Sequence, residues 1–313
     1  MIGLDDIRAA ADRIAPHVRR TPVIAVKAVE DAPTDARLLL KLECLQVTGS
    51  FKARGATNKL LSLPQAAVAG GIVTASGGNH GLAVARAARM AGVPARVFVP
   101  ASTTAEKQEK LRRWGAGVTV TGATWNEADA VARAEAARSG AAYFHPFADP
   151  AVVAGQGTVA LELLEAAPQV DTVLVAIGGG GLIAGMAVAL KALRPDIRII
   201  GVEPVGSPTL KASLEAGRVV ELDSVTSRVA TMSCARTDPG VFDLIRALVD
   251  EVVLITDRDM EEAAAWLWFE MGIAADLSGA ASIAALRAGK VVPPRGAVVG
   301  GLVCGAGLDA AAS

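Results

Sequence analysis

Short apolar runs alternate with longer alanine-rich segments along almost the whole chain, and this alternation limits the fold more than any other feature. Buried strands are indicated at Leu38–Leu42, Gly71–Ala75, Arg96–Pro100, Val118–Thr121, Thr172–Ile177, Ile197–Glu203, Val252–Thr256 and Ala297–Val303. Helical patterns lie between them at Gly81–Ala91, Thr104–Trp114, Asn126–Arg138 and Asp259–Trp268. Strands and helices in alternation predict an α/β fold in which a parallel sheet is covered by helices on both faces.

Composition excludes several classes of partner. The 313 residues are 52% hydrophobic and carry a formal net charge of -1, so the chain can bury a large core, and we expect two lobes and no nucleic acid or anionic membrane as partner. The three cysteines share no CxxC spacing, which fits a reducing compartment. The charged pattern of Asp5–Ile14 is unlike a signal peptide, and the apolar runs are too short to span a bilayer. A cytoplasmic protein is expected.

Lys52 is a candidate nucleophile. It follows Phe51 and precedes Ala53 within the turn-rich run Thr48–Ala56. An amine held against an apolar surface loses part of its preference for the charged form and can attack an aldehyde. The run therefore makes Lys52 a candidate Schiff-base lysine, although an isolated lysine is most often a solvated surface charge.

A run of four glycines, Gly178–Gly181, separates a predicted strand from a predicted helix that begins at Leu182. Such a turn directs backbone N–H groups and the helix dipole toward an anion, most often a phosphate. The spacing of Gly179, Gly181 and Ala184, with Glu203 about twenty residues later, also satisfies a dinucleotide fingerprint. A dinucleotide site, a single-phosphate cofactor site and a purely structural turn are all consistent with this segment.

Two further loops follow predicted strands. Ser76–Gly81 offers hydroxyl, amide and backbone donors that could bind a carboxylate at a helix N-terminus. The alternative is a structural role, in which the serine is a helix N-cap and the asparagine adopts a left-handed turn. Gly300–Gly307 places Cys304 at the carboxyl end of the last strand, where open sheets bind ligands. A buried cysteine is more often just a small hydrophobic residue.

These segments, in this order, resemble the serine/threonine dehydratase family of enzymes that use pyridoxal 5'-phosphate (PLP), which have fold type II. The residues that carry the resemblance are Ser50–Gly55, Ser76–Gly81, Gly178–Gly181 and Val303–Gly305. The resemblance implies two α/β domains with open, twisted, mostly parallel sheets and the cofactor between them. It places the small domain at 46–148, the large domain at 1–45 plus 149–313, and implies a homodimer.

The resemblance also implies roles for individual residues. Lys52 is the catalytic residue: it forms the Schiff base and then acts as general base. Phe51 packs near the ring, Asn79 hydrogen-bonds the ring hydroxyl, and Cys304 lies beside the pyridine nitrogen. The implied cofactor-binding residues are Phe51, Lys52, Asn79, Gly178, Gly179, Gly180, Gly181 and Cys304. The implied substrate-binding residues are Ser76, Gly77, Asn79 and His80.

The predicted reaction is elimination of water from a β-hydroxy amino acid. A thiol of ordinary pKa cannot keep the pyridine nitrogen protonated, so the ring is a weaker electron sink and β-elimination is favoured. An ammonia-lyase that converts L-threonine or L-serine to a 2-oxo acid and ammonia is therefore expected. Racemases of the family carry a serine where this chain has Gly77, so racemisation should be minor.

Departures from the family pattern leave alternatives open. Glu203 matches one acidic metal ligand of relatives, but Thr209 stands at the second position, so no metal site is predicted and Glu203 is kept as a candidate. The family's usual Ala-Asp-Gly segment in the cleft appears as Ala230-Thr231-Met232, and its usual Glu-Pro appears as Asp276-Leu277, so the polarity near the amino-acid pocket differs. The alternatives are a dehydratase for 3-hydroxyaspartate or an aryl-serine, a non-catalytic protein that binds PLP or amino acids, and an NAD-dependent oxidoreductase.

Overall fold

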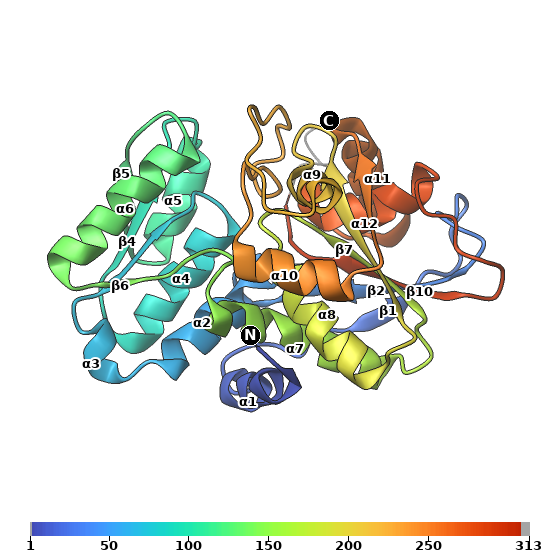
Figure 1. The fold of residues 1–313 in the computed structure, drawn as a ribbon, viewed down its shortest axis with the longest axis horizontal. Coiled ribbons are helices and arrows are strands. Elements are labelled where there is room, and N and C mark those ends of the chain that lie inside the picture. The colour runs from blue at the N-terminus through green and yellow to red at the C-terminus, as the bar shows by residue number, and fades with distance from the viewer. Residues whose placement is uncertain (1, 308–313) are drawn as a thin grey trace.

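The computed structural model describes residues 2–307, which form two open, mostly parallel sheets flanked by helices (Figure 1). This confirms the predicted α/β class. The six-stranded sheet has the order β1-β2-β10-β7-β8-β9. Its strands are β1 (Val23–Ala25), β2 (Arg37–Leu42), β10 (Val298–Val303), β7 (Thr172–Ala176), β8 (Arg198–Pro204) and β9 (Glu251–Ile255). Within this sheet β1 pairs antiparallel with β2, and the other neighbouring strands run parallel.

Helices cover both faces of the larger sheet. One group packs together on one face and consists of α1 (Leu4–Ile14), α7 (Pro150–Ala166), α8 (Gly181–Leu193) and α10 (Pro239–Leu248). The opposite group contains α11 (Asp257–Met271) and α12 (Leu277–Arg287), and α12 lies directly on the strands. The short helix α9 (Thr209–Ala216) follows β8.

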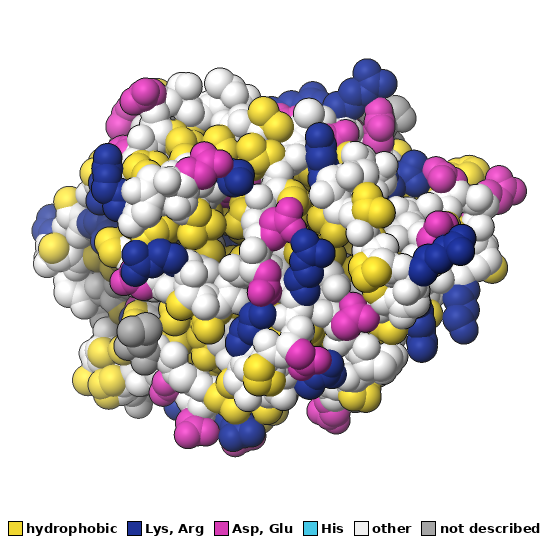
Figure 2. All heavy atoms as spheres, turned by 45° about the vertical axis from the view of Figure 1, so that its right-hand side comes forward, with side chains coloured by type: hydrophobic (Ala, Val, Ile, Leu, Met, Phe, Trp, Pro, Cys, Tyr) yellow, Lys and Arg dark blue, Asp and Glu magenta, His cyan; other side chains and the backbone are white. Residues whose placement is uncertain are grey.

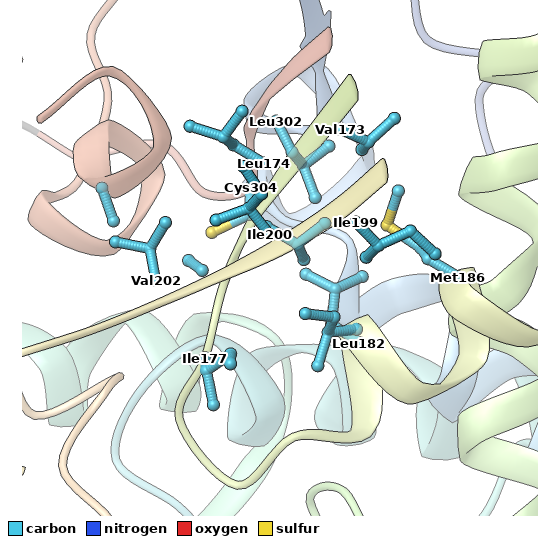
Figure 3. Packing of buried hydrophobic residues seen from close by; sticks show 14 of the residues in the cluster. Val173, Leu174, Ile177, Leu182, Met186, Ile199, Ile200, Val202, Leu302 and Cys304 are labelled. Carbon is cyan, nitrogen blue, oxygen red and sulfur yellow. The ribbon is translucent and has the colours of Figure 1, made fainter. Parts of the chain in front are cut away.

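The core of this half explains why its strands read as continuous apolar runs. Every residue of β7 is buried, because both faces of the strand are covered. Figure 3 shows Val173 and Leu174 of this strand packed with Ile199 and Ile200 of β8 and with Leu182 of α8. Alternating polar residues, which mark a half-exposed strand, are therefore absent from β7.

The smaller sheet has the order β5-β4-β3-β6, and its strand pairs are parallel. Its strands are β5 (Ala116–Val120), β4 (Ala95–Val99), β3 (Ile72–Ala75) and β6 (Ala142–Tyr143). Its helices are α2 (Lys52–Ser62), α3 (Gln65–Val68), α4 (Asn79–Ala91), α5 (Ala105–Arg113) and α6 (Trp125–Ser139). Separate apolar clusters, one with residues of α4 and one with residues of α6, pack against this sheet.

Two connections join the sheets. After β2 the chain passes through the 3-10 turns η1 (Glu43–Leu45) and η2 (Val47–Gly49) into α2, and after β6 it returns to α7. Helix α2 contacts both α4 of the smaller half and α7 of the larger half. The division of domains at 46–148 stays a prediction, which we propose on the basis of these two connections.

Charged side chains are scattered over the face shown in Figure 2, with Lys and Arg interspersed among Asp and Glu. This mixture agrees with the formal net charge of -1. Within residues 2–307, no helix combines the length and the apolar composition that a membrane crossing requires.

Candidate active site

Segments far apart in the sequence meet at the carboxyl ends of the parallel strands, where open α/β sheets bind ligands. The turn before Lys52 is hydrogen-bonded to the end of β10: Phe51 N donates to Cys304 O (3.2 Å), and Ala306 N donates to Gly49 O (2.8 Å). Ser50 also forms a β-bridge with Gly305. The structure therefore brings the candidate lysine segment and the candidate cysteine segment together.

The amine of Lys52 is held close to polar and apolar neighbours. Its Nζ donates to the carbonyl oxygen of Pro146 (2.7 Å) and lies 5.1 Å from the centroid of the Phe51 ring. Burial lowers the pKa of Lys52 to about 8. The neutral amine that a nucleophile or general base requires is therefore a minor form at pH 7 and reaches about half at pH 8.

The loop after β3 leads into α4, which begins at Asn79. Gly78 N donates to Ser76 Oγ (3.3 Å), and Asn79 Nδ2 donates to Asp276 Oδ2 (2.9 Å). A Cβ at Gly81 would lie 2.1 Å from the carbonyl oxygen of Ser76, so only glycine allows this tight entry into the helix. The loop is therefore fixed both within itself and to the larger half.

His80 is buried in the first turn of α4. Its Nε2 bonds the carbonyl oxygen of Phe144 (3.1 Å), so Nε2 carries the proton, and Nδ1 is buried without a hydrogen-bond partner among the described residues. Burial and the charge of Lys52 lower the pKa of His80 to about 3. The ring is thus a neutral acceptor near Lys52, and its predicted contact with a substrate carboxylate stays a prediction.

The segment after β6, Phe144–Asp149, connects three parts of the site. It accepts hydrogen bonds from His80 at Phe144 O and from Lys52 at Pro146 O. His145 Nδ1 accepts from the backbone N–H groups of Phe147 (3.2 Å) and Ala148 (2.9 Å), which fixes the turn. Burial, followed by the charge of Arg133, lowers the pKa of His145 to about 4. Both histidines of the site are therefore neutral at neutral pH.

The glycine run lies between β7 and α8. Gly180 has φ 93, in the left-handed region where glycine is favoured. A Cβ at Gly179 would lie 2.1 Å from the Phe147 ring, and a Cβ at Gly181 would lie 2.5 Å from the Phe147 carbonyl oxygen. Thr237 Oγ1 donates to Gly179 O (3.0 Å). These glycines therefore admit the packing of Phe147, while the N-terminus of α8 keeps the donors that suit an anion.

Cys304 lies at the end of β10, and Figure 3 shows it among the buried residues of the larger core. Its Sγ donates to Ser278 O (3.3 Å). Burial, followed by the negative charge of Asp276, raises the pKa of the thiol far above its ordinary value. Cys304 is therefore a neutral thiol, and it offers no negative charge that could pair with a cation.

Glu203 is fully buried, and its side chain accepts hydrogen bonds from backbone N–H groups. Its Oε1 accepts from Leu210 N (2.8 Å) and its Oε2 from Lys211 N (2.9 Å), so the carboxylate caps α9. Burial raises the pKa of Glu203 to about 7. Because both oxygens are occupied inside the fold, this residue does not suit the ribose contact of a dinucleotide site. In residues 2–307, no group of three or more His, Cys, Asp or Glu side chains is arranged to hold a metal ion.

Two threonines lie next to the glycines of the loop after β3. A Cβ at Gly77 would lie 2.7 Å from Cγ2 and 2.8 Å from Oγ1 of Thr103, and a Cβ at Gly78 would lie 3.6 Å from Cγ2 of Thr231. The sequence interpretation missed Thr103. Its place just after β4, the parallel neighbour of β3, is the signal that could have found it.

A buried ion network holds the helix that carries Lys52. The Arg54 guanidinium bonds both oxygens of Glu43 (2.7 and 2.8 Å) and both oxygens of Glu162 (2.7 and 2.9 Å). Lys41 Nζ bonds Glu162 Oε2 (2.5 Å) and Thr21 O (2.7 Å). Two cations and two carboxylates balance, and they join α2 to the end of β2 and to α7. The network fixes α2 relative to the larger half.

Comparisons with known proteins agree with this geometry. The family described as "Pyridoxal-phosphate dependent enzyme" matches residues 14–305. An L-threonine ammonia-lyase of Geobacter sulfurreducens is 40% identical over 293 residues, which are 94% of this chain and 73% of that protein. The structure of maize serine racemase is similar with TM-score 0.92 and 35% identity, over 97% of this chain and 93% of that one. A solved threonine deaminase from T.th. has TM-score 0.90 and 38% identity, over 97% of this chain and 98% of that one.

Proposed function

Because the chain belongs to the serine/threonine dehydratase family of PLP-dependent enzymes, we propose that it is an ammonia-lyase for a β-hydroxy amino acid. L-threonine and L-serine are the proposed substrates, and a 2-oxo acid and ammonia are the products. Relatives include both lyases and racemases. The choice between these reactions must therefore come from this chain's own residues.

The residues of the site fit PLP, the cofactor of the family. Lys52 offers a partly neutral amine for the aldehyde. The N-terminus of α8 suits the phosphate, Asn79 suits the ring hydroxyl, and Cys304 suits an unprotonated pyridine nitrogen. His80 Nδ1 is a buried acceptor without a partner among the described residues, as expected beside a site that a ligand fills. When bound, PLP supplies the electron-withdrawing system that lets the α-proton of an amino acid leave.

Lys52 is the proposed general base. Burial lowers the pKa of its amine to about 8, whereas it holds His80 and His145 neutral with pKa values of about 3 and 4. The Pro146 carbonyl, which now accepts from Nζ, directs the amine while it holds a proton.

One observation carries the choice of elimination over racemisation. Gly77 has no side chain, and Thr103 fills the space that a residue with a Cβ would need there. Racemases of the family place a second base, a serine, at this position. Without this serine, the loop at Gly77 has no side chain that could return a proton to the α-carbon. Loss of the β-hydroxyl is therefore the favoured outcome.

We expect L-threonine or L-serine to give oxo acid in excess of D-amino acid. The measurement combines a coupled 2-oxo acid assay with chiral chromatography of the remaining amino acid. Predominant D-enantiomer would contradict the proposal, and a Thr103→Val variant would then show whether that hydroxyl supplies the proton. Bound PLP without product from any β-hydroxy amino acid tested would instead favour the binding-protein alternative.

The capture of PLP by the cofactor-free protein should follow the titration of Lys52. The neutral amine attacks the aldehyde, so the rate should rise with pH and level off above a midpoint near pH 8, well below the ordinary lysine value of 10.5. Stopped-flow absorbance between pH 6.5 and 9.5 measures it. A rate that still increases in proportion to hydroxide at the upper end would show that the amine is not perturbed.

We also propose that the protein is a cytoplasmic homodimer. Its proposed partner is an amino acid substrate, and no nucleic acid or membrane is proposed as a partner. Support comes from the family membership and from a net charge of -1.

A further inference from the structure

Asp276 joins the two halves of the candidate site. It precedes α12 of the larger half, and only 9% of the residue is exposed. Its Oδ2 accepts from Asn79 Nδ2 of the smaller half (2.9 Å), 197 positions away in the chain. Its Oδ1 accepts from Gly279 N (2.6 Å) and from Ser278 Oγ (2.7 Å).

These contacts determine which way the Asn79 amide points. A carboxylate only accepts hydrogen bonds, so the NH₂ group of Asn79 must face Asp276, and its carbonyl oxygen must face away. The carboxylate cannot rotate out of this arrangement, because its other oxygen caps α12 through Gly279 N. Asn79 therefore keeps one N–H in a fixed direction after bonding Asp276.

Asp276 also affects Cys304, the residue proposed to contact the ring nitrogen. Its backbone N donates to Gly305 O (3.0 Å), next to Cys304, and Cys304 Sγ donates to Ser278 O (3.3 Å). After burial, the charge of Asp276 is the next cause that raises the pKa of the Cys304 thiol. One carboxylate thus borders the residues proposed for the ring hydroxyl and for the ring nitrogen.

We propose that Asp276 is a positioning residue for the cofactor, which orients the Asn79 amide so that one N–H is presented to the ring hydroxyl of PLP. This inference rests on the proposed function in one respect, the contact between Asn79 and the ring hydroxyl. It adds that the contact depends on Asp276, which accepts a hydrogen bond from Asn79.

The Asp276→Asn variant tests the orientation. An asparagine at this position has one acceptor oxygen, so its NH₂ group must face either Gly279 N–H or Asn79. If the new NH₂ group faces Asn79, two NH₂ groups oppose each other. Rotation of the Asn79 amide removes this clash, but it withdraws the Asn79 donor from the ring hydroxyl. The Kd for PLP should rise about tenfold to a hundredfold, as for loss of a hydrogen bond involving a charged group. The absorption band of the bound cofactor should shift.

A double-mutant cycle separates positioning from folding. Asn79→Ala should raise the Kd by a similar factor, and adding Asp276→Asn to it should change the Kd and the band no further, because the two residues act as one unit. Asp276→Ser keeps a helix N-cap and should behave like Asp276→Asn. Thermal unfolding of each cofactor-free variant checks that the fold is retained.

Two outcomes would overturn the inference: effects of Asn79→Ala and Asp276→Asn that multiply in the double variant, or an Asp276→Asn protein with unchanged Kd and band. The titration needs PLP but no amino acid. A protein that binds PLP with this coupling and yet forms no oxo acid would refute the proposed reaction and leave the role of Asp276 standing.

Discussion

Replacing Lys52 by alanine should abolish turnover of L-threonine and L-serine and remove the absorption band of covalently held PLP. The loss should be about a thousandfold or more, because a general base alone contributes about 10²- to 10⁴-fold and the covalent attachment is lost as well. Oxo acid formation and the visible spectrum, recorded on protein reconstituted with PLP, measure both effects.

Two controls make this result specific. Lys52→Arg keeps a cation on α2 but offers no neutral amine at accessible pH, so it should be as inactive as Lys52→Ala. A small primary amine added to Lys52→Ala should restore part of the turnover, because it can replace the missing base. A Lys52→Ala protein that keeps the original band and most of its activity would show that another residue holds the cofactor.

Arg54→Met should destabilise the fold by about 3–5 kcal/mol, the usual cost of breaking a buried ion pair by removing one partner. Arg54 and Glu43 are 1% and 0% exposed, and Arg54 binds Glu162 as well. Without it, two carboxylates face the cation of Lys41, and Glu43, which is 0% exposed, cannot regain water. Urea unfolding of the cofactor-free protein, compared with wild type, measures the difference in free energy of unfolding.

A surface pair provides the matched control for Arg54. Arg258 and Glu262 are one helical turn apart on α11 with side chains 83% and 58% exposed, so Arg258→Ala should cost less than about 1 kcal/mol. Adding Glu43→Gln to Arg54→Met should recover part of the stability, because it removes one unpaired charge. A cost for Arg54→Met as small as that for Arg258→Ala would mean that water reaches the network.

The strands of the fold could be predicted where they are long and buried on both faces. The run at Thr172–Ile177 reads as a strand because its residues are continuously apolar, and β7 occupies Thr172–Ala176. β1 and β6, with three and two residues, are too short to show a period, and neither was predicted. Their place is decided by pairing with strands distant in the sequence.

The site was predicted as separate motifs, and the contacts between motifs were not. Lys52 and Cys304 were both selected, yet the hydrogen bond from Phe51 N to Cys304 O arises from the pairing of β2 with β10. Asp276 was noticed as a change in cleft polarity, and its bond to Asn79 spans 197 positions. Glu203 fitted a ribose-binding pattern, but its burial under α9 gives it a different role. Spacing alone carries no information on such burial.

The two passages of chain between the sheets suggest a hinge. Helix α2 and helix α7 lie against each other, and the ion pair of Lys59 with Asp149 links them at the start of α7. A rotation of the smaller half about an axis through these two connections would move the loop at Asn79 only if the hydrogen bond from Asn79 Nδ2 to Asp276 Oδ2 broke. Lys52, close to the axis at the start of α2, would move little. Such a movement would open the site to an amino acid without displacing the lysine that we propose as the general base.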